Sequence, residues 1–96
     1  MTIKTIIELQ AKAGRRDELL KASDDVLASM KNAPGFRGVK RYEIIDNHDS
    51  LIEIAEWESP EARQIWLEQT MKTGALNRLN LLLGNPFKAI TIREIQ

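Results

Sequence analysis

The sequence predicts an α+β fold of the ferredoxin-like type, in which strands and helices follow the order β-α-β-β-α-β. Three observations favour it: an alternating apolar stretch near the N-terminus, two amphipathic helical stretches that end at proline or glycine, and two strand-like stretches between them. In this fold a four-stranded antiparallel sheet carries its helices on one face. The 96 residues predict a single domain over 1–96, because a chain of this length supports only one hydrophobic core.

The first strand is expected over residues 3–11, where apolar and polar side chains alternate. Gly14 ends it, and a helix follows whose apolar side chains recur at three- and four-residue spacing as far as Met30. Pro34 stops this helix, because proline lacks an amide donor and disfavours helical geometry in the preceding residue.

Two antiparallel strands are expected over Phe36–Ile45 and Leu51–Trp57, joined by the turn-forming residues 46–50. Ser59 and Pro60 then mark the start of the second helix. A serine hydroxyl accepts a hydrogen bond from a free backbone N–H, and proline at the first helical position leaves no donor missing.

The second helix is expected to run to Lys72, to break at Thr73-Gly74 and to resume as a leucine-rich segment through Leu83. Gly84-Asn85-Pro86 ends that segment. A final strand over Phe87–Ile95 completes the predicted sheet.

Apolar side chains fall on both faces of the predicted sheet, although helices cover only one face. A strand that is buried on one side alternates cleanly, so the second apolar face predicts a homodimer in which two sheets pack together. The alternative is a monomer with a solvated second face, since single exposed isoleucines are common. The residues assigned to this face are Ile6, Val39, Ile45, Ile52, Ile54, Ile90 and Ile92.

Charge and composition exclude several classes of function. Fourteen basic and fourteen acidic side chains are mixed along the chain without a basic stripe, so nucleic acid is not an expected partner. The N-terminus alternates like a strand rather than forming a secretory signal, and no apolar run approaches the ~20 residues that span a bilayer. We therefore expect no membrane partner and a cytoplasmic location.

Metal and cofactor motifs are missing from the sequence. It has no cysteine, which excludes disulfides, a thiolate nucleophile and sulfur ligands for a metal. The single histidine, His48, falls in the predicted turn 46–50, where hydrogen bonding within the turn is more common than catalysis. With no glycine-rich phosphate loop and no histidine pair either, the residues predict no metal site and no cofactor.

Trp66 is the candidate site residue. It follows Ala62 by four positions and Ile65 by one, which predicts a common helical face turned toward the sheet, with Gln69 continuing it. Two interpretations stay open. Trp66 is either a core tryptophan or a wall of a cavity between helix and sheet, where a flat aromatic ligand stacks and the indole N–H donates a hydrogen bond.

Three stretches resemble the antibiotic biosynthesis monooxygenase family of dimeric α+β barrels. They are Ala-Gly-Arg-Arg-Asp-Glu-Leu-Leu at 13–20, Ala-Pro-Gly at 33–35 and Glu-Trp-Glu-Ser-Pro-Glu-Ala at 56–62. The family usually has a proline where this chain has Ala13. The resemblance implies the fold above, a homodimer, and an activity like those of the family's quinol or anthrone oxygenases, haem-degrading enzymes or quorum-signal-processing enzymes.

Many family members carry histidines at the positions of Trp66 and Met71. A tryptophan at the first position resembles the haem-degrading and polyketide-tailoring branches. The haem-degrading branch also has an iron-ligating histidine and a first-strand asparagine, where this chain has Leu76 and Ile7. The resemblance therefore implies a site that works without haem.

Together, residues and resemblance predict a cofactor-independent monooxygenase for a small quinol-like or anthrone-like aromatic, held in an apolar pocket between sheet and helices. Trp66 is the best catalytic candidate. The expected ligand contacts are Ile7, Leu9, Met30, Tyr42, Trp66, Gln69, Met71 and Leu79. The alternative is a non-catalytic homodimer of the same fold that binds a small molecule or is structural, which the lack of a well-placed base favours. A third interpretation is an assembly or regulatory module that exposes the second sheet face to a partner protein.

Overall fold

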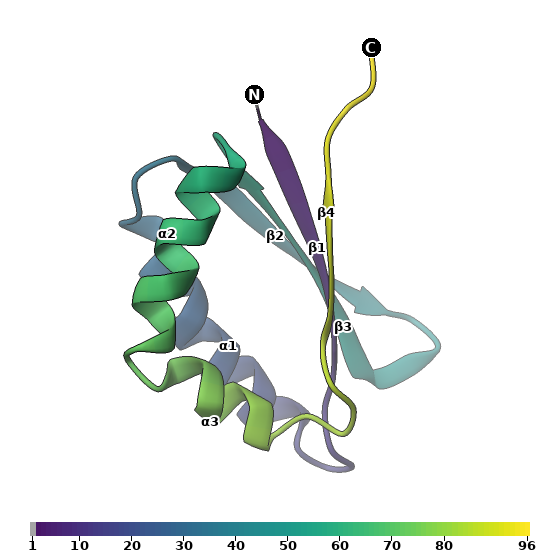
Figure 1. The fold of residues 1–96 in the computed structure, drawn as a ribbon. Helices are drawn as coiled ribbons and strands as arrows, with labels where there is room; N and C mark the ends of the chain where they lie inside the picture. The colour runs from purple at the N-terminus through teal and green to yellow at the C-terminus, as the bar shows by residue number, and fades with distance from the viewer. Residues whose placement is uncertain (1) are drawn as a thin grey trace.

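The computed structural model describes residues 2–96 as a four-stranded antiparallel sheet with its helices on one face (Figure 1). The strands lie in the order β2-β3-β1-β4. This is the predicted ferredoxin-like α+β arrangement, with the second helix split in two. The elements are β1 (Ile3–Gln10), α1 (Arg16–Lys31), β2 (Phe36–Ile44), β3 (Asn47–Trp57), α2 (Pro60–Met71), α3 (Ala75–Leu81) and β4 (Lys88–Ile92).

The helix boundaries follow the predicted capping and breaking residues. Ser59 Oγ accepts a hydrogen bond from the backbone N–H of Ala62 at 3.1 Å, and Pro60 is the first residue of α2. Gly74 separates α2 from α3 with a φ of 81°, a left-handed conformation that glycine adopts without a steric penalty. None of the helices in residues 2–96 is long and apolar enough to cross a membrane.

The hydrophobic core lies between the helices and the sheet. Trp57, Leu9 and Leu19 are completely or almost completely buried there. Because these side chains are closely packed, the helices are held in a defined position on the inner face of the sheet. The remaining buried apolar side chains are Ile3, Ala11, Val26, Leu27, Met30, Leu51, Ala55, Trp66, Ala75, Leu79 and Leu83.

A polar network attaches α1 to the sheet. Glu53 is only 5% exposed and accepts hydrogen bonds from Ser23 Oγ and, at 3.0 Å, from Arg41 Nε. The same guanidinium pairs with Asp24 at 2.7 Å and donates to the backbone carbonyl of Leu20 at 3.1 Å. A buried carboxylate is tolerated only when it is paired in this way. The network therefore fixes α1 against β2 and β3.

The connection between β2 and β3 differs from the prediction. Ile44 pairs with Asn47, so the turn holds only two residues, Ile45 and Asp46, and β3 begins at Asn47 instead of Leu51. His48 lies in the strand and not in a loop. The turn-forming residues of 47–50 join the strand because pairing with neighbouring strands outweighs local propensity. The final strand is also shorter than predicted and spans Lys88–Ile92.

The sheet face opposite the helices, called the outer face below, is bare in Figure 1. Strand register places Ile6 opposite both Ile54 and Ile90, and directly opposed residues share a face. Ile52 and Ile92, opposite Glu8 and Lys4 of β1, lie on the same face.

Two residues assigned to the outer face in the sequence lie elsewhere. Val39 pairs with Ala55 and packs against the core, because a β-bulge between Phe36 and Gly38 shifts the alternation. Ile45 lies in the turn and is 89% exposed.

Candidate functional site

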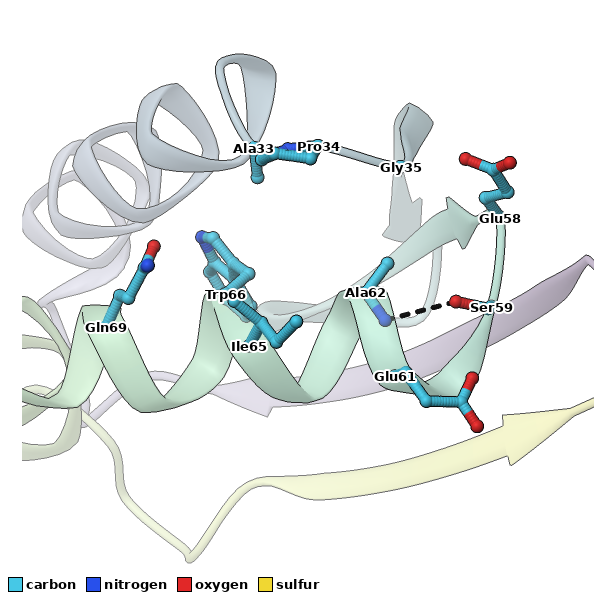
Figure 2. A pocket seen from close by; sticks show the side chains of 10 residues that line it. All are labelled: Ala33, Pro34, Gly35, Glu58, Ser59, Glu61, Ala62, Ile65, Trp66 and Gln69. Atoms are coloured by element: carbon cyan, nitrogen blue, oxygen red, sulfur yellow. Dashed lines mark hydrogen bonds between the residues drawn. The ribbon is translucent and has the colours of Figure 1, made fainter.

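A groove of about 300 Å³ lies between the loop after α1 and the first turns of α2 (Figure 2). Its volume is at the lower end of the ~300–1,000 Å³ typical of small-molecule pockets. Its lining is mostly apolar. The lining residues are Ala33, Pro34, Gly35, Glu58, Ser59, Glu61, Ala62, Ile65, Trp66 and Gln69.

The Trp66 side chain comes from α2 and is 6% exposed. Its Nε1–H donates to Ser29 Oγ of α1 at 3.0 Å, and the Ser29 hydroxyl donates in turn to the backbone carbonyl of Val26 at 2.6 Å. Figure 2 shows the nitrogen end of the indole directed toward the α1 side. The indole N–H is therefore engaged inside the protein, and the ring itself is what Trp66 contributes to the groove.

Trp66 packs on a second tryptophan, which in turn contacts a phenylalanine. Its ring centroid lies 5.5 Å from that of Trp57, with the planes inclined by 38°. Trp57 in turn makes an edge-to-face contact with Phe36 at 5.3 Å. Such pairs contribute about 0.5–1.5 kcal/mol beyond the area they bury. These two ring contacts connect the groove to the inner face of the sheet.

Gly35 lets the loop after α1 lie directly on α2. It has a φ of 85°, and its carbonyl accepts a hydrogen bond from the Glu58 N–H at 2.7 Å. A Cβ atom at this position would lie 2.6 Å from the Cβ of Ala62, closer than packed atoms allow. The close approach defines one wall of the groove, and only glycine fits it.

The polar groups of the groove stand at its two ends. Gln69 lies one turn beyond Trp66, and Glu58 and Glu61 lie at the start of α2 (Figure 2). Among residues 2–96, no lysine, arginine or histidine lines the groove. This arrangement suits a flat, uncharged or cationic ring stacked on apolar surface, with one amide in reach.

Two of the eight predicted ligand contacts, Trp66 and Gln69, line this groove. Ile7, Leu9, Met30 and Leu79 pack in or against the core between helices and sheet, where the pocket was predicted. Met71 is 62% exposed at the end of α2. Tyr42 pairs with Ile52, so it lies on the outer face, across the sheet from Trp66. As ligand contacts all eight residues stay a prediction.

Sequence reasoning missed Ser29 and the loop after α1 as parts of the site. Ala33, Pro34 and Gly35 were recognised as a helix stop and as part of the family resemblance, but not as lining a site, although the glycine was a signal for a close backbone approach. Ser29 carries no local pattern that connects it with Trp66. Their contact depends entirely on how α1 packs on α2.

His48 is far from this groove. It lies near the start of β3, whereas the groove lies beyond the opposite end of that strand, after Trp57. At about 3.3 Å per residue the separation along the strand is roughly 30 Å. His48 therefore takes no part in the site within this chain.

Comparison with solved structures finds proteins that have the same fold as this chain. The chain is similar to a single-residue variant of the cofactor-independent oxygenase SnoaB from Streptomyces nogalater, with a TM-score of 0.88 and 18% identity over 99% of this chain and 94% of that one. A conserved protein from Methanosarcina mazei gives 0.89 and 14% identity over 99% and 94%. Rv0793 from Mycobacterium tuberculosis gives 0.87 and 16% over 100% and 97%.

At these identities the structural likeness establishes the fold alone. None of the curated protein sequences compared with the chain is significantly similar to it. The family model described as antibiotic biosynthesis monooxygenase matches residues 2–72, which is well over half of the chain. On this evidence the chain belongs to the antibiotic biosynthesis monooxygenase family.

Proposed function

We propose that this protein is a cofactor-independent monooxygenase that oxidises a small, electron-rich aromatic substrate of the quinol or anthrone class in the Trp66 groove. The observation that carries the proposal is the position of Trp66, whose ring lines a mostly apolar groove in a chain that belongs to a monooxygenase family. SnoaB, which shares the fold, is described as a cofactor-independent oxygenase, and this supports the proposal.

The substrate itself supplies the electrons in such a reaction. Loss of a proton from the methylene carbon of an anthrone gives a carbanion that transfers one electron to dioxygen. The two radicals combine to form a C–O bond, and the peroxide anion that results takes back one proton, which balances the proton lost from carbon. This hydroperoxide then loses water to leave a quinone. The carbon is oxidised by four electrons and dioxygen is reduced by four, with one oxygen atom in the new carbonyl and the other in water. No external reductant is needed.

The protein has to orient the ring, exclude water and stabilise the developing oxyanion. The sequence predicts three possible donors to that oxyanion, namely Trp66, Gln69 and Tyr42. The Trp66 N–H is engaged by Ser29 and Tyr42 lies on the outer face, whereas Gln69 lines the groove. We therefore assign the donor role to the Gln69 amide and the orienting role to the Trp66 ring.

We also propose that the protein is a homodimer through the outer face. Five isoleucines of β1, β3 and β4 share this face: Ile6, Ile52, Ile54, Ile90 and Ile92. Ile90 is 60% exposed and Tyr42 47% exposed in one chain, so a large apolar area meets water. Covering it with the same face of a second copy would give an isologous interface.

The proposed reaction is tested by dioxygen uptake. Purified protein, treated with a chelator to remove adventitious metal, is mixed with a panel of anthrones and quinols in an oxygen electrode. The proposal expects faster uptake than the buffer alone, loss of most of the acceleration in Trp66→Phe, and full retention in Ile45→Ala at the exposed turn. No acceleration with any member of the panel would overturn the reaction, and equal rates in Trp66→Phe would remove Trp66 from it.

A further inference from the structure

We infer that Ser29 is a positioning residue that locks the Trp66 indole in the orientation that forms the groove wall. The inference rests on the proposed function, because it deepens the role of Trp66 in that same groove. Ser29 lies on the last turn of α1 and touches the groove only through the tryptophan. It is thus a residue that would affect binding by acting through another side chain.

The two hydrogen bonds of Ser29 have defined donors and acceptors. A serine hydroxyl has one hydrogen to donate, and here it is used on the Val26 carbonyl at 2.6 Å. What remains on Ser29 Oγ is acceptor capacity, which the Trp66 Nε1–H fills at 3.0 Å. Trp66 has a donor and no acceptor on its ring. In this pair Trp66 Nε1–H is therefore the donor and Ser29 Oγ the acceptor.

The opposite side of the ring is held by packing. Trp57, which is completely buried, lies 5.5 Å from Trp66 between centroids. The helix backbone of α2 limits the side-chain rotamers that Trp66 can adopt. With its face restrained by Trp57 and its N–H restrained by Ser29, the ring has little freedom to turn.

Loss of the Ser29 hydroxyl would leave the Trp66 N–H without its acceptor. Trp66 is only 6% exposed, although Ser29 itself lies at the surface. An indole N–H that loses its acceptor in such a residue is costly, so the ring would turn toward water or another acceptor. The apolar wall of the groove would then change shape, even though no residue that touches the ligand had been altered. Because Ser29 engages the indole N–H, a ligand in the groove need not offer an acceptor to it.

The test compares Ser29→Ala with Ser29→Thr, which keeps the hydroxyl, and with Asp25→Ala, a control at an exposed position one turn earlier on α1. Hydrogen exchange of the Trp66 indole N–H is followed by ¹H–¹⁵N NMR in the ligand-free protein, with the signal assigned from Trp66→Phe. Binding of 1-naphthol, as the probe, is followed by the backbone amide shifts of Gly35 and Ala62. Far-UV circular dichroism and melting temperature confirm that each variant is folded.

We expect Ser29→Ala to move the Trp66 indole signal, to speed its exchange and to weaken 1-naphthol about 2- to 10-fold, the range of one net hydrogen bond. Ser29→Thr and Asp25→Ala should match the unaltered protein in all three. An unchanged indole signal in Ser29→Ala would overturn the lock, as would a folded Ser29→Thr that behaves like Ser29→Ala. Because none of the three readouts involves oxygen, a protein that shows the lock but no oxygen uptake would disprove the reaction and leave the lock standing.

Discussion

Gly35 and Ala62 approach each other so closely that a methyl group on the glycine would sit 2.6 Å from the Ala62 Cβ. This contact seats the loop after α1 on the first turn of α2 and so creates the groove that Trp66 lines. The site therefore depends on one backbone approach as much as on any side chain.

Replacing Gly35 with alanine should destabilise the protein by about 2–5 kcal/mol. The left-handed backbone costs about 1–2 kcal/mol for a residue with a Cβ, and the clash with Ala62 adds an overpacking cost of about 1–3 kcal/mol. Gly14→Ala is the matched control, because Gly14 also has a positive φ, 76°, but open space around its Cβ position. Urea unfolding measures both variants, and equal losses of stability would show that the contact with Ala62 does not constrain the loop.

Removing the buried carboxylate of Glu53 should also be costly. Glu53→Ala would leave the Ser23 hydroxyl and part of the Arg41 guanidinium without their partner beneath α1. Because Arg41 keeps its contact with Asp24, we expect a loss of about 2–4 kcal/mol, at or below the usual cost of breaking a buried ion pair.

The control for Glu53 is Glu43→Ala. Glu43 pairs with Arg16 at 2.8 Å, but its side chain is 73% exposed, and exposed pairs contribute less than about 1 kcal/mol. Chemical denaturation of the two variants should separate them clearly. A Glu53→Ala protein as stable as Glu43→Ala would mean that the network contributes nothing to holding α1.

A charge on the outer face should break the proposed dimer. Light scattering at micromolar concentration should give the unaltered protein twice the 10.9 kDa of one chain. Ile54→Lys should give a single chain's mass, since burying an unpaired ammonium in an apolar interface is strongly unfavourable. Ile45→Lys, at the exposed turn, should remain dimeric. A single-chain mass for the unaltered protein would refute the dimer.

The acidic end of the groove should discriminate between charged ligands. Glu58 and Glu61 line it, and neither forms an ion pair with any residue from 2 to 96. We expect 1-naphthylmethylamine, which is a cation, to bind about 3- to 10-fold more tightly than 1-naphthoate, as for exposed charges that attract weakly.

Two controls identify the source of that preference. The Glu58→Gln/Glu61→Gln double variant should bind both compounds with similar affinity, and 0.5 M salt should reduce the difference in the unaltered protein through screening. Isothermal titration calorimetry gives the six affinities. A preference that survives the double substitution must come from groups other than these carboxylates.

Local sequence signals were sufficient to predict the order of the elements. Ser59 and Pro60 begin α2, Gly74 interrupts it, and Pro34 follows α1, as capping and backbone chemistry require. The two-residue turn at Ile45 and the bulge before Gly38 were not predictable in this way, because register depends on pairing between distant strands.

The site was predicted only in part. Trp66 and Gln69 were recognised from their helical spacing, and both line the groove. A pocket between helices and sheet stays a prediction for the region where the core residues pack, whereas the groove opens beside the loop after α1. Tertiary packing decides which face of α2 meets that loop. It also brings Ser29 to the position where it accepts the indole hydrogen. Periodicity alone carries no information on either.

The central claim is that an aromatic ligand binds on the Trp66 ring. The most direct test is a ¹H–¹⁵N NMR titration of the unaltered protein with an anthrone under anaerobic conditions, which keeps the ligand intact. We predict saturable shifts for the amides of Gly35, Ala62, Ile65 and Gln69, with none around His48. Shifts confined to the outer-face strand residues, or no saturable shifts at the groove, would contradict the claim.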